Sequence, residues 1–253
     1  MTNDHCDDGF WEGARAAGWS FLPGLLTPAE VRRVREELAG LSATPDLHPD
    51  CMYYVDVDAG GGRHLARVER IWEALPSLGE TGIGRRLKEC AARYLGEDVA
   101  LFKDKLNIRY AGSNGYSPHQ DSAAGWEEFA DHFVSIGVFL GTSDRAHGGF
   151  EVVGGVHRDG RFPNDKGRMS DAFFDGMDRI SVSAGLGDAI VLDSEAPHRT
   201  LPNRTSEDAL HLLFTFAPAR AGAAREAYYA RKESSFSEKK EKNIFEFRVF
   251  SFQ

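Results

Sequence analysis

The chain has 253 residues, of which 42% are hydrophobic, and a formal net charge of −9. A chain of this length and hydrophobic content can bury a substantial core in one domain. Its acidity, together with the lack of a basic cluster before Lys239, argues against nucleic acid or an anionic membrane as the main partner. The sequence does not indicate an oligomeric state.

The N-terminus and the cysteines indicate the compartment. Residues Met1–Asp8 are acidic and lack the basic start and apolar core of a signal peptide, and no apolar run approaches the length of a transmembrane helix. The cysteines, Cys6, Cys51 and Cys90, are scattered and form no C-x-x-C motif, so we expect neither a disulfide framework nor a zinc knuckle. This pattern is typical of a cytoplasmic protein.

Two amphipathic helices are predicted in the first part of the chain. Thr27-Pro28-Ala29-Glu30 has the pattern of a capping box with proline at the first helical position, and apolar residues follow it at helical spacing. A second apolar stripe runs over residues 83–95, with Gly96 as the expected stop. Both stripes are expected to pack against the core of the protein rather than to bind a partner.

From Val99 the apolar residues follow the alternating period of β-strands. Leu106, Ile108 and Tyr110 alternate with polar residues, and further strand-like runs lie at 134–140, 149–153, 180–183, 188–193, 210–216 and 244–250. Many short strands, with helices gathered at the N-terminal end, predict a mainly β fold of the double-stranded β-helix (jelly-roll, cupin-like) type. We expect a single domain over 1–253, with a helical part at about 1–98 and a jelly-roll core at about 99–253.

A candidate metal site is formed by His119-Gln120-Asp121 and a distant histidine. In an extended segment, residues two positions apart lie on the same side, so His119 and Asp121 can share one ion. His198 follows a strand-like apolar run and Pro197. Two histidines and one carboxylate make a facial triad, which leaves open positions on an octahedral ferrous ion.

Around these residues the chain resembles the phytanoyl-CoA dioxygenase (PhyH) family of non-haem Fe(II)- and 2-oxoglutarate-dependent oxygenases. The similar segments are Phe102–Asn107, Gly148–His157, which resembles G-x-L-x-V-x-P-G-S-H, and Pro197–Asn203, which resembles P-H-R-S-x-P-N. The bacterial branch that hydroxylates small polar metabolites, including organophosphonates, also has a tail like Tyr228–Lys232. The resemblance extends over most of the chain from about Gly18.

The resemblance implies a reaction and its cofactors. His119, Asp121 and His198 would be the catalytic metal ligands for Fe(II), with 2-oxoglutarate as co-substrate and O2 as oxidant. We expect hydroxylation of an unactivated C–H bond in a small polar metabolite or an intermediate of secondary metabolism. Epimerisation, desaturation and cyclisation of a natural-product scaffold stay open as alternatives. Halogenation is disfavoured, because the halogenating members of this superfamily lack the carboxylate that Asp121 provides.

Two other classes of protein are compatible with the triad. A zinc hydrolase can use the same ligands, although no general base stands at motif spacing. A cupin-like binding protein without turnover would keep the fold alone. Metal analysis and uncoupled decarboxylation of 2-oxoglutarate separate these classes from an oxygenase.

The co-substrate residues are expected from the resemblance and from one departure. Related enzymes place Ser or Thr two residues after the distal histidine, where Thr200 stands, and Arg eleven residues after it, where this chain has Ala209. We expect another cation to pair with the distal carboxylate of 2-oxoglutarate. Lys105, which shares a strand face with Asn107, is the first candidate, followed by Arg204 and His211. Weak binding of 2-oxoglutarate, or the use of another oxo acid, stays open as the alternative.

The substrate residues are expected near the metal ligands in sequence. Arg109, Tyr116 and Trp126 predict a polar pocket mouth with aromatic walls, and residues 157–179 form a long polar loop beside it. This composition favours a small or medium polar metabolite, with anionic metabolites among the candidates, over a fatty acyl-CoA.

Overall fold

The computed structural model describes residues 7–58, 60–79, 82–236 and 244–248. The elements in chain order are α1 (Asp8–Ala17), β1 (Trp19–Leu22), α2 (Pro28–Ala43), η1 (Pro45–Leu47), β2 (Met52–Val57), β3 (Arg63–Glu69), α3 (Gly82–Leu95), β4 (Val99–Arg109), η2 (Asp121–Ala124), η3 (Trp126–Glu128), β5 (Val134–Phe139), β6 (Phe150–Val153), α4 (Asp171–Asp175), β7 (Arg179–Val182), β8 (Ala189–Asp193), β9 (His198–Thr200), β10 (Ala209–Pro218), η4 (Ala219–Ala221), α5 (Ala224–Phe236) and β11 (Ile244–Arg248).

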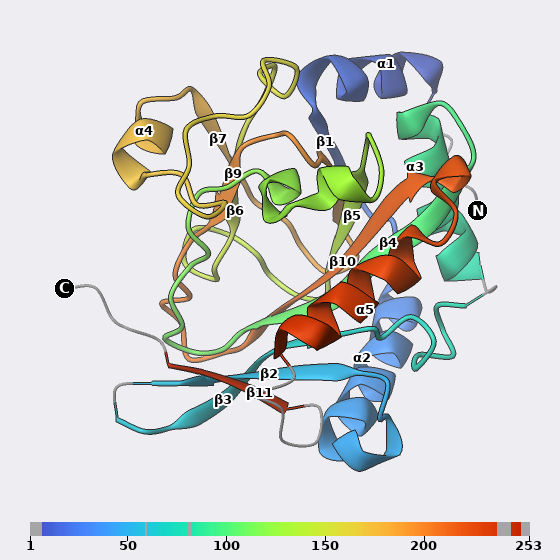
Figure 1. The fold of residues 1–253 in the computed structure, drawn as a ribbon. Helices are drawn as coiled ribbons and strands as arrows, with labels where there is room; N and C mark the ends of the chain where they lie inside the picture. The colour runs from blue at the N-terminus through green and yellow to red at the C-terminus, as the bar shows by residue number, and fades with distance from the viewer. Residues whose placement is uncertain (1–6, 59, 80–81, 237–243, 249–253) are drawn as a thin grey trace.

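Two β-sheets form the body of the molecule (Figure 1). The larger has the strand order β1-β8-β5-β10-β4-β3-β2-β11, and the smaller has the order β7-β6-β9. Every pairing is antiparallel except that of β11 with β2. The sheets face each other across an apolar cluster. In it the Phe139 ring of β5 packs edge to face against the Phe150 ring of β6, with 5.8 Å between the ring centres. The predicted jelly roll is confirmed.

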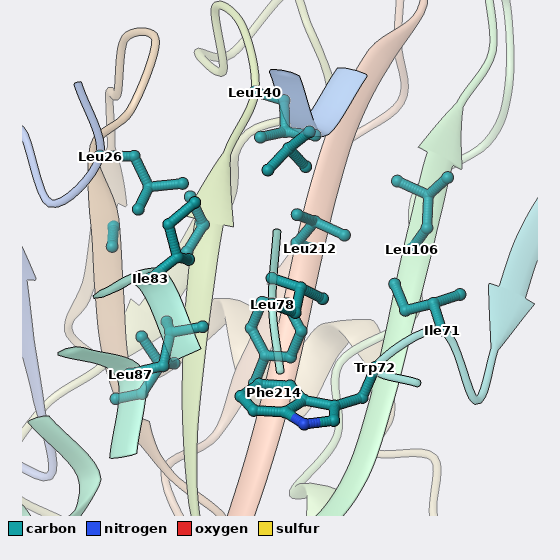
Figure 2. Packing of buried hydrophobic residues seen from close by; sticks show 14 of the residues in the cluster. Leu26, Ile71, Trp72, Leu78, Ile83, Leu87, Leu106, Leu140, Leu212 and Phe214 are labelled. Atoms are coloured by element: carbon teal, nitrogen blue, oxygen red, sulfur yellow. The ribbon is translucent and has the colours of Figure 1, made fainter. Parts of the chain in front are cut away.

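The outer face of the large sheet is covered by α2 and α3. Along β10, Leu212, Phe214 and Phe216 point to this face and join the helices in the main core, whereas the residues between them point to the interior. Figure 2 shows Leu212 and Phe214 packed with Trp72, Ile83 and Leu87. This alternation follows from the two-residue period of a strand, and it separates an apolar outer face from an inner face that can carry polar groups.

The two predicted helices are confirmed at α2 and α3. Thr27 caps α2 with both hydrogen bonds of the capping box, and Gly96 follows α3 with φ at 76°. The part of the chain before Val99 is not only helical, however, because it also contains β1, β2 and β3. β1 pairs with β8 and β3 pairs with β4, so these strands extend the same large sheet.

The C-terminal helix α5 lies across the large sheet at β4 (Figure 1). Tyr228 and Tyr229 pack there against an aromatic cluster that contains Phe102 and Trp126. Arg225 forms an ion pair with Asp104, a fully buried residue of β4. No helix in the described ranges is long and apolar enough to cross a membrane.

Candidate active site

The predicted metal ligands lie together between the two sheets. The backbones of His119 and His198 exchange two hydrogen bonds, of 2.9 and 3.0 Å, which hold the His119–Asp121 segment beside β9. The ligand atoms of His119, Asp121 and His198 lie within 4.8 Å of one another. His119 Nε2 is 3.4 Å from an Asp121 carboxylate oxygen. This spacing allows all three side chains to reach one ion.

The backbone sets the tautomer of both imidazoles. His119 Nδ1 donates to the carbonyl of Ser117 at 2.7 Å, and His198 Nδ1 donates to the carbonyl of Ala196 at 2.9 Å. Because a carbonyl can only accept, the proton of each neutral ring is on Nδ1 and the Nε2 lone pair is available to a metal.

The protonation states also suit a metal site. Burial lowers the pKa of His198 to about 4, so this imidazole is neutral at physiological pH. Burial alone would raise the pKa of Asp121, but the adjacent imidazoles of His119 and His198 and the charge of Lys105 hold it well below its usual range. A neutral His198 imidazole and an ionised Asp121 carboxylate fit ferrous iron with open coordination positions.

A cavity of about 380 Å³ adjoins the triad. Five cationic side chains line it: Arg67, Lys103, Lys105, Lys166 and Arg168. Among the described residues that line it, Asp121 is the only carboxylate. A larger cavity, of about 760 Å³, lies between α1, β1 and β7 and contains none of the predicted site residues.

A buried carboxylate orders the cations at one side of this cavity. Glu69 lies 3.5 Å from Arg67 and 3.8 Å from Lys103, and it also binds Lys232 of α5. Burial alone would raise the pKa of Glu69, but these three cations hold it well below its usual range. Three cations around one carboxylate leave a net positive charge beside the triad.

Five predicted binding residues line the cavity together with the triad: Lys105, Asn107, Tyr116, Trp126 and Thr200. The backbone N–H of Tyr116 donates to Thr200 Oγ1 at 2.9 Å, and the Tyr116 hydroxyl lies 3.5 Å from Asn107 Oδ1. The predicted loop at the mouth contributes Lys166, Gly167 and Arg168.

Three predicted residues do not line the cavity. Arg204 is exposed, and its backbone N–H bonds to the Ala146 carbonyl, so its position does not favour a role in co-substrate binding. Arg109 and His211 are buried, with Arg109 stacked on the Tyr116 ring at 4.6 Å.

Three residues at the site were not predicted from the sequence: Arg67, Lys103 and Glu69. The alternation that singled out Lys105 and Asn107 includes Lys103, so extending it by one step would have found this residue. Arg67 and Glu69 stand opposite Asn107 and Lys105 in the β3–β4 pairing, which no local pattern reveals.

Fold and site together define a jelly-roll protein with an open His/Asp/His metal site. The family model for phytanoyl-CoA dioxygenase (PhyH) matches residues 14–209. The chain is 30% identical over 222 residues to a methylphosphonate hydroxylase of Gimesia maris, covering 87% of this chain and 84% of that protein. It is 22% identical over 221 residues to a 2-aminoethylphosphonate dioxygenase of an uncultured bacterium, with the same two coverages.

Solved structures share the fold. EctD from S. alaskensis, in complex with 2-oxoglutarate and 5-hydroxyectoine, has a TM-score of 0.70 at 18% identity, over 87% of this chain and 79% of that one. EvdO2 from Micromonospora carbonacea, in complex with 2-oxoglutarate, has a TM-score of 0.66 at 19% identity, over 85% of this chain and 91% of that one. The chain belongs to the PhyH family, and it is a non-haem Fe(II)- and 2-oxoglutarate-dependent oxygenase.

Proposed function

We propose that the chain hydroxylates a small anionic metabolite of the organophosphonate class, with His119, Asp121 and His198 as the ligands of Fe(II). The observation that carries this proposal is the charge of the cavity: five cationic side chains line it, and among the described lining residues the only carboxylate is Asp121 of the triad. The names of the two relatives, which act on methylphosphonate and 2-aminoethylphosphonate, favour the same class. Bound iron with 2-oxoglutarate supplies the chemistry, because it activates O2 to oxidise a C–H bond while the co-substrate becomes succinate and CO2.

The protein's own residues bind and orient the substrate in this proposal. Arg67 and Lys103, which Glu69 holds in place, are the donors for the doubly charged headgroup, because charge-assisted hydrogen bonds to such an anion are strong. Trp126 forms a wall beside Lys103, whose ammonium lies 5.5 Å from its ring centre. A cavity of about 380 Å³ encloses a small metabolite but not a long-chain acyl-CoA.

The co-substrate has its own part of the cavity in this proposal. Lys105, Asn107 and Thr200 line the cavity together with the triad, and we assign them to 2-oxoglutarate. Lys105 adds positive charge beside the metal ligands, although burial and the neighbouring Lys103 lower its pKa to about 8.

A turnover screen tests the substrate class. The anaerobically purified protein, with its metal content measured, would be given Fe(II), 2-oxoglutarate, O2 and methylphosphonate, 2-aminoethylphosphonate, polar amino acids or long-chain acyl-CoA. We expect saturable succinate release with a phosphonate and a product heavier by one oxygen atom. An unchanged product mass would indicate epimerisation, and the loss of two hydrogens would indicate desaturation or cyclisation. Turnover of acyl-CoA alone would contradict the proposal, and zinc in place of iron with no succinate release would favour a hydrolase.

A further inference from the structure

Arg109, on the inner face of β4, is a buried cation without an ion-pair partner among the described residues. Its side chain is 4% exposed, and neither Nε nor Nη2 has a hydrogen-bond partner. Burial raises the pKa of the nearby Asp56 carboxyl, although the charge of Arg109 acts in the opposite direction. Among the described residues, Asp56 and Arg109 do not form an ion pair. A buried charge needs a partner, so these nitrogens point to an anion that binds there.

His211 is a second buried group of the same kind. Both of its ring nitrogens lack hydrogen-bond partners, and the ring packs against Phe139 and Phe150. Burial, helped by the charge of Arg109, lowers the pKa of His211 to about 3, so the imidazole is neutral. A neutral imidazole can donate one hydrogen bond to an anion without adding a second buried charge.

The strand register places these groups together. Arg109 pairs with Ala209, and Asn107 pairs with His211, across β4 and β10. The Arg109 side chain also runs beside the turn at Gly148, where an added Cβ would lie 3.3 Å from Arg109 Cγ and 3.3 Å from the Leu201 carbonyl oxygen. Arg109 therefore lies near the segment after Thr200, behind the Tyr116 ring that lines the cavity.

We propose that Arg109, with His211 as a neutral donor beside it, binds the far carboxylate of 2-oxoglutarate. This inference rests on the proposed function, in which the other end of the co-substrate lies at the triad. It replaces Lys105 as the first candidate for the anchor. Related enzymes have an arginine at the position of Ala209 on β10. Arg109 lies opposite Ala209 on the neighbouring strand β4, so it can supply a guanidinium in the same part of the sheet.

The position of Arg109 favours the co-substrate over the prime substrate. Arg67 and Lys103 line the cavity and are available to a substrate headgroup, whereas Arg109 lies outside the lining, under Tyr116. 2-Oxoglutarate would bind the metal held by the triad at one end. The carboxylate at its other end could then form an ion pair with Arg109. The Tyr116 ring would rotate away from the guanidinium to admit that carboxylate.

Equilibrium binding without turnover tests the assignment. The Fe(II)-loaded protein would be titrated with 2-oxoglutarate under anaerobic conditions by calorimetry. We expect Arg109→Gln to raise the Kd at least about tenfold, as the loss of a charge-assisted contact predicts. The double variant Arg109→Gln/Ala209→Arg should recover most of the affinity, because it restores a guanidinium on the paired strand. Arg32→Gln, which removes an exposed arginine of α2, is the matched control and should bind normally.

The outcomes separate this inference from the proposed function. If the wild-type protein with Fe(II) does not bind 2-oxoglutarate, both fall. If it binds and Arg109→Gln binds equally well, or if Lys105→Ala shows the loss instead, only the role of Arg109 is overturned. A rise in the KM of the prime substrate with an unchanged Kd for 2-oxoglutarate would also overturn it. If Arg109→Gln does not fold, Arg109→Lys keeps the charge but loses the paired N–H donors of the guanidinium, so weaker binding of 2-oxoglutarate by this folded variant would support the inference, whereas normal binding would overturn it.

Discussion

At the scale of single residues, the orientation of the metal ligands depends on backbone carbonyls rather than on other side chains. His119 and His198 each donate Nδ1–H to a carbonyl two residues earlier, and their own backbones pair with each other. The ring directions are therefore fixed before any ion binds, which lowers the cost of ordering the site. Asp121 is the ligand without such a backbone tether, and it is the one whose removal tests the site most cleanly.

Asp121→Ala should abolish iron-dependent succinate release and leave the fold intact. The variant loses the charged ligand, while the two backbone hydrogen bonds between His119 and His198 stay in place. Bound iron per chain, succinate release and the circular dichroism spectrum would be measured together, with Asp46→Ala as a control that removes an exposed carboxylate. Wild-type succinate release by Asp121→Ala would show that the triad is assigned wrongly.

Lys103→Gln should weaken binding of the prime substrate much more than binding of 2-oxoglutarate. The loss of one charge-assisted hydrogen bond, worth about 1.5–3 kcal/mol, should raise the KM for the phosphonate roughly 10- to 100-fold. Steady-state kinetics with each substrate varied in turn would check this. Equal changes in both KM values would mean that Lys103 acts on the cavity as a whole and does not hold the substrate.

The sequence predicts the site residues that local patterns connect. His119 and Asp121 belong to one short motif, and Lys105 and Asn107 follow from alternation along one strand. Arg67 and the pairing of Arg109 with Ala209 depend on the register between strands far apart in the chain. Register follows from the packing of both faces of a sheet, so single-strand patterns did not reveal these two features.

At the scale of elements, Asp193 of β8 joins α3 to the loop before β5, and His132 of that loop is one of its partners. The His132 Nε2 lies 2.9 Å from Asp193, which also accepts a hydrogen bond from the Tyr94 hydroxyl at 2.9 Å. The hydrogen bond to Asp193 raises the pKa of His132 above its usual value. A histidine whose pKa is higher in the folded state stabilises the fold below the unfolded pKa, and this contribution is lost as pH rises through the folded pKa.

His132→Gln should therefore destabilise the protein more at pH 5.5 than at pH 8.5. The difference is modest, because His132 is 48% exposed and water screens the pair. Urea unfolding at both pH values would give the two differences in the free energy of unfolding. Tyr94→Phe is the control, since burial raises the pKa of Tyr94 far above this range and its loss should cost the same at both pH values. A pH-independent effect of His132→Gln would mean that the residue stabilises the fold through packing alone.

Whether an element could be predicted from the sequence depends on the polarity of its two faces. α2 and α3 have one apolar and one polar face, and the sequence shows both helices with nearly the observed ends. β3 has the sequence Arg-His-Leu-Ala-Arg-Val-Glu, and its inner face carries Arg67 and Glu69 because it borders the cavity. A strand with charged residues toward the interior lacks the usual alternation of apolar and polar residues. The charged groups that the cavity requires are therefore the reason that β3 was not predicted.

At the scale of the whole molecule, the metal site connects the two sheets. His198 lies on β9 of the small sheet, and the segment that carries His119 and Asp121 follows β4 of the large sheet. The chain as a whole is acidic, yet the space between the sheets contains a concentration of cations that repel one another until anions bind. Binding of the metal and of anionic ligands should therefore stabilise the entire fold rather than one loop.

Fe(II) and 2-oxoglutarate together should raise the melting temperature of the protein. A ligand that binds only the folded state at about 100 times its Kd adds about 2.7 kcal/mol, which for a chain of this size corresponds to roughly 5–10 °C. Anaerobic differential scanning calorimetry, with EDTA as the metal-free reference, would measure the shift. Asp121→Ala should lose most of it, because the metal can no longer hold the co-substrate between the sheets. An equal shift in the wild-type protein and in Asp121→Ala would mean that the two ligands bind elsewhere, and that the triad does not join the sheets.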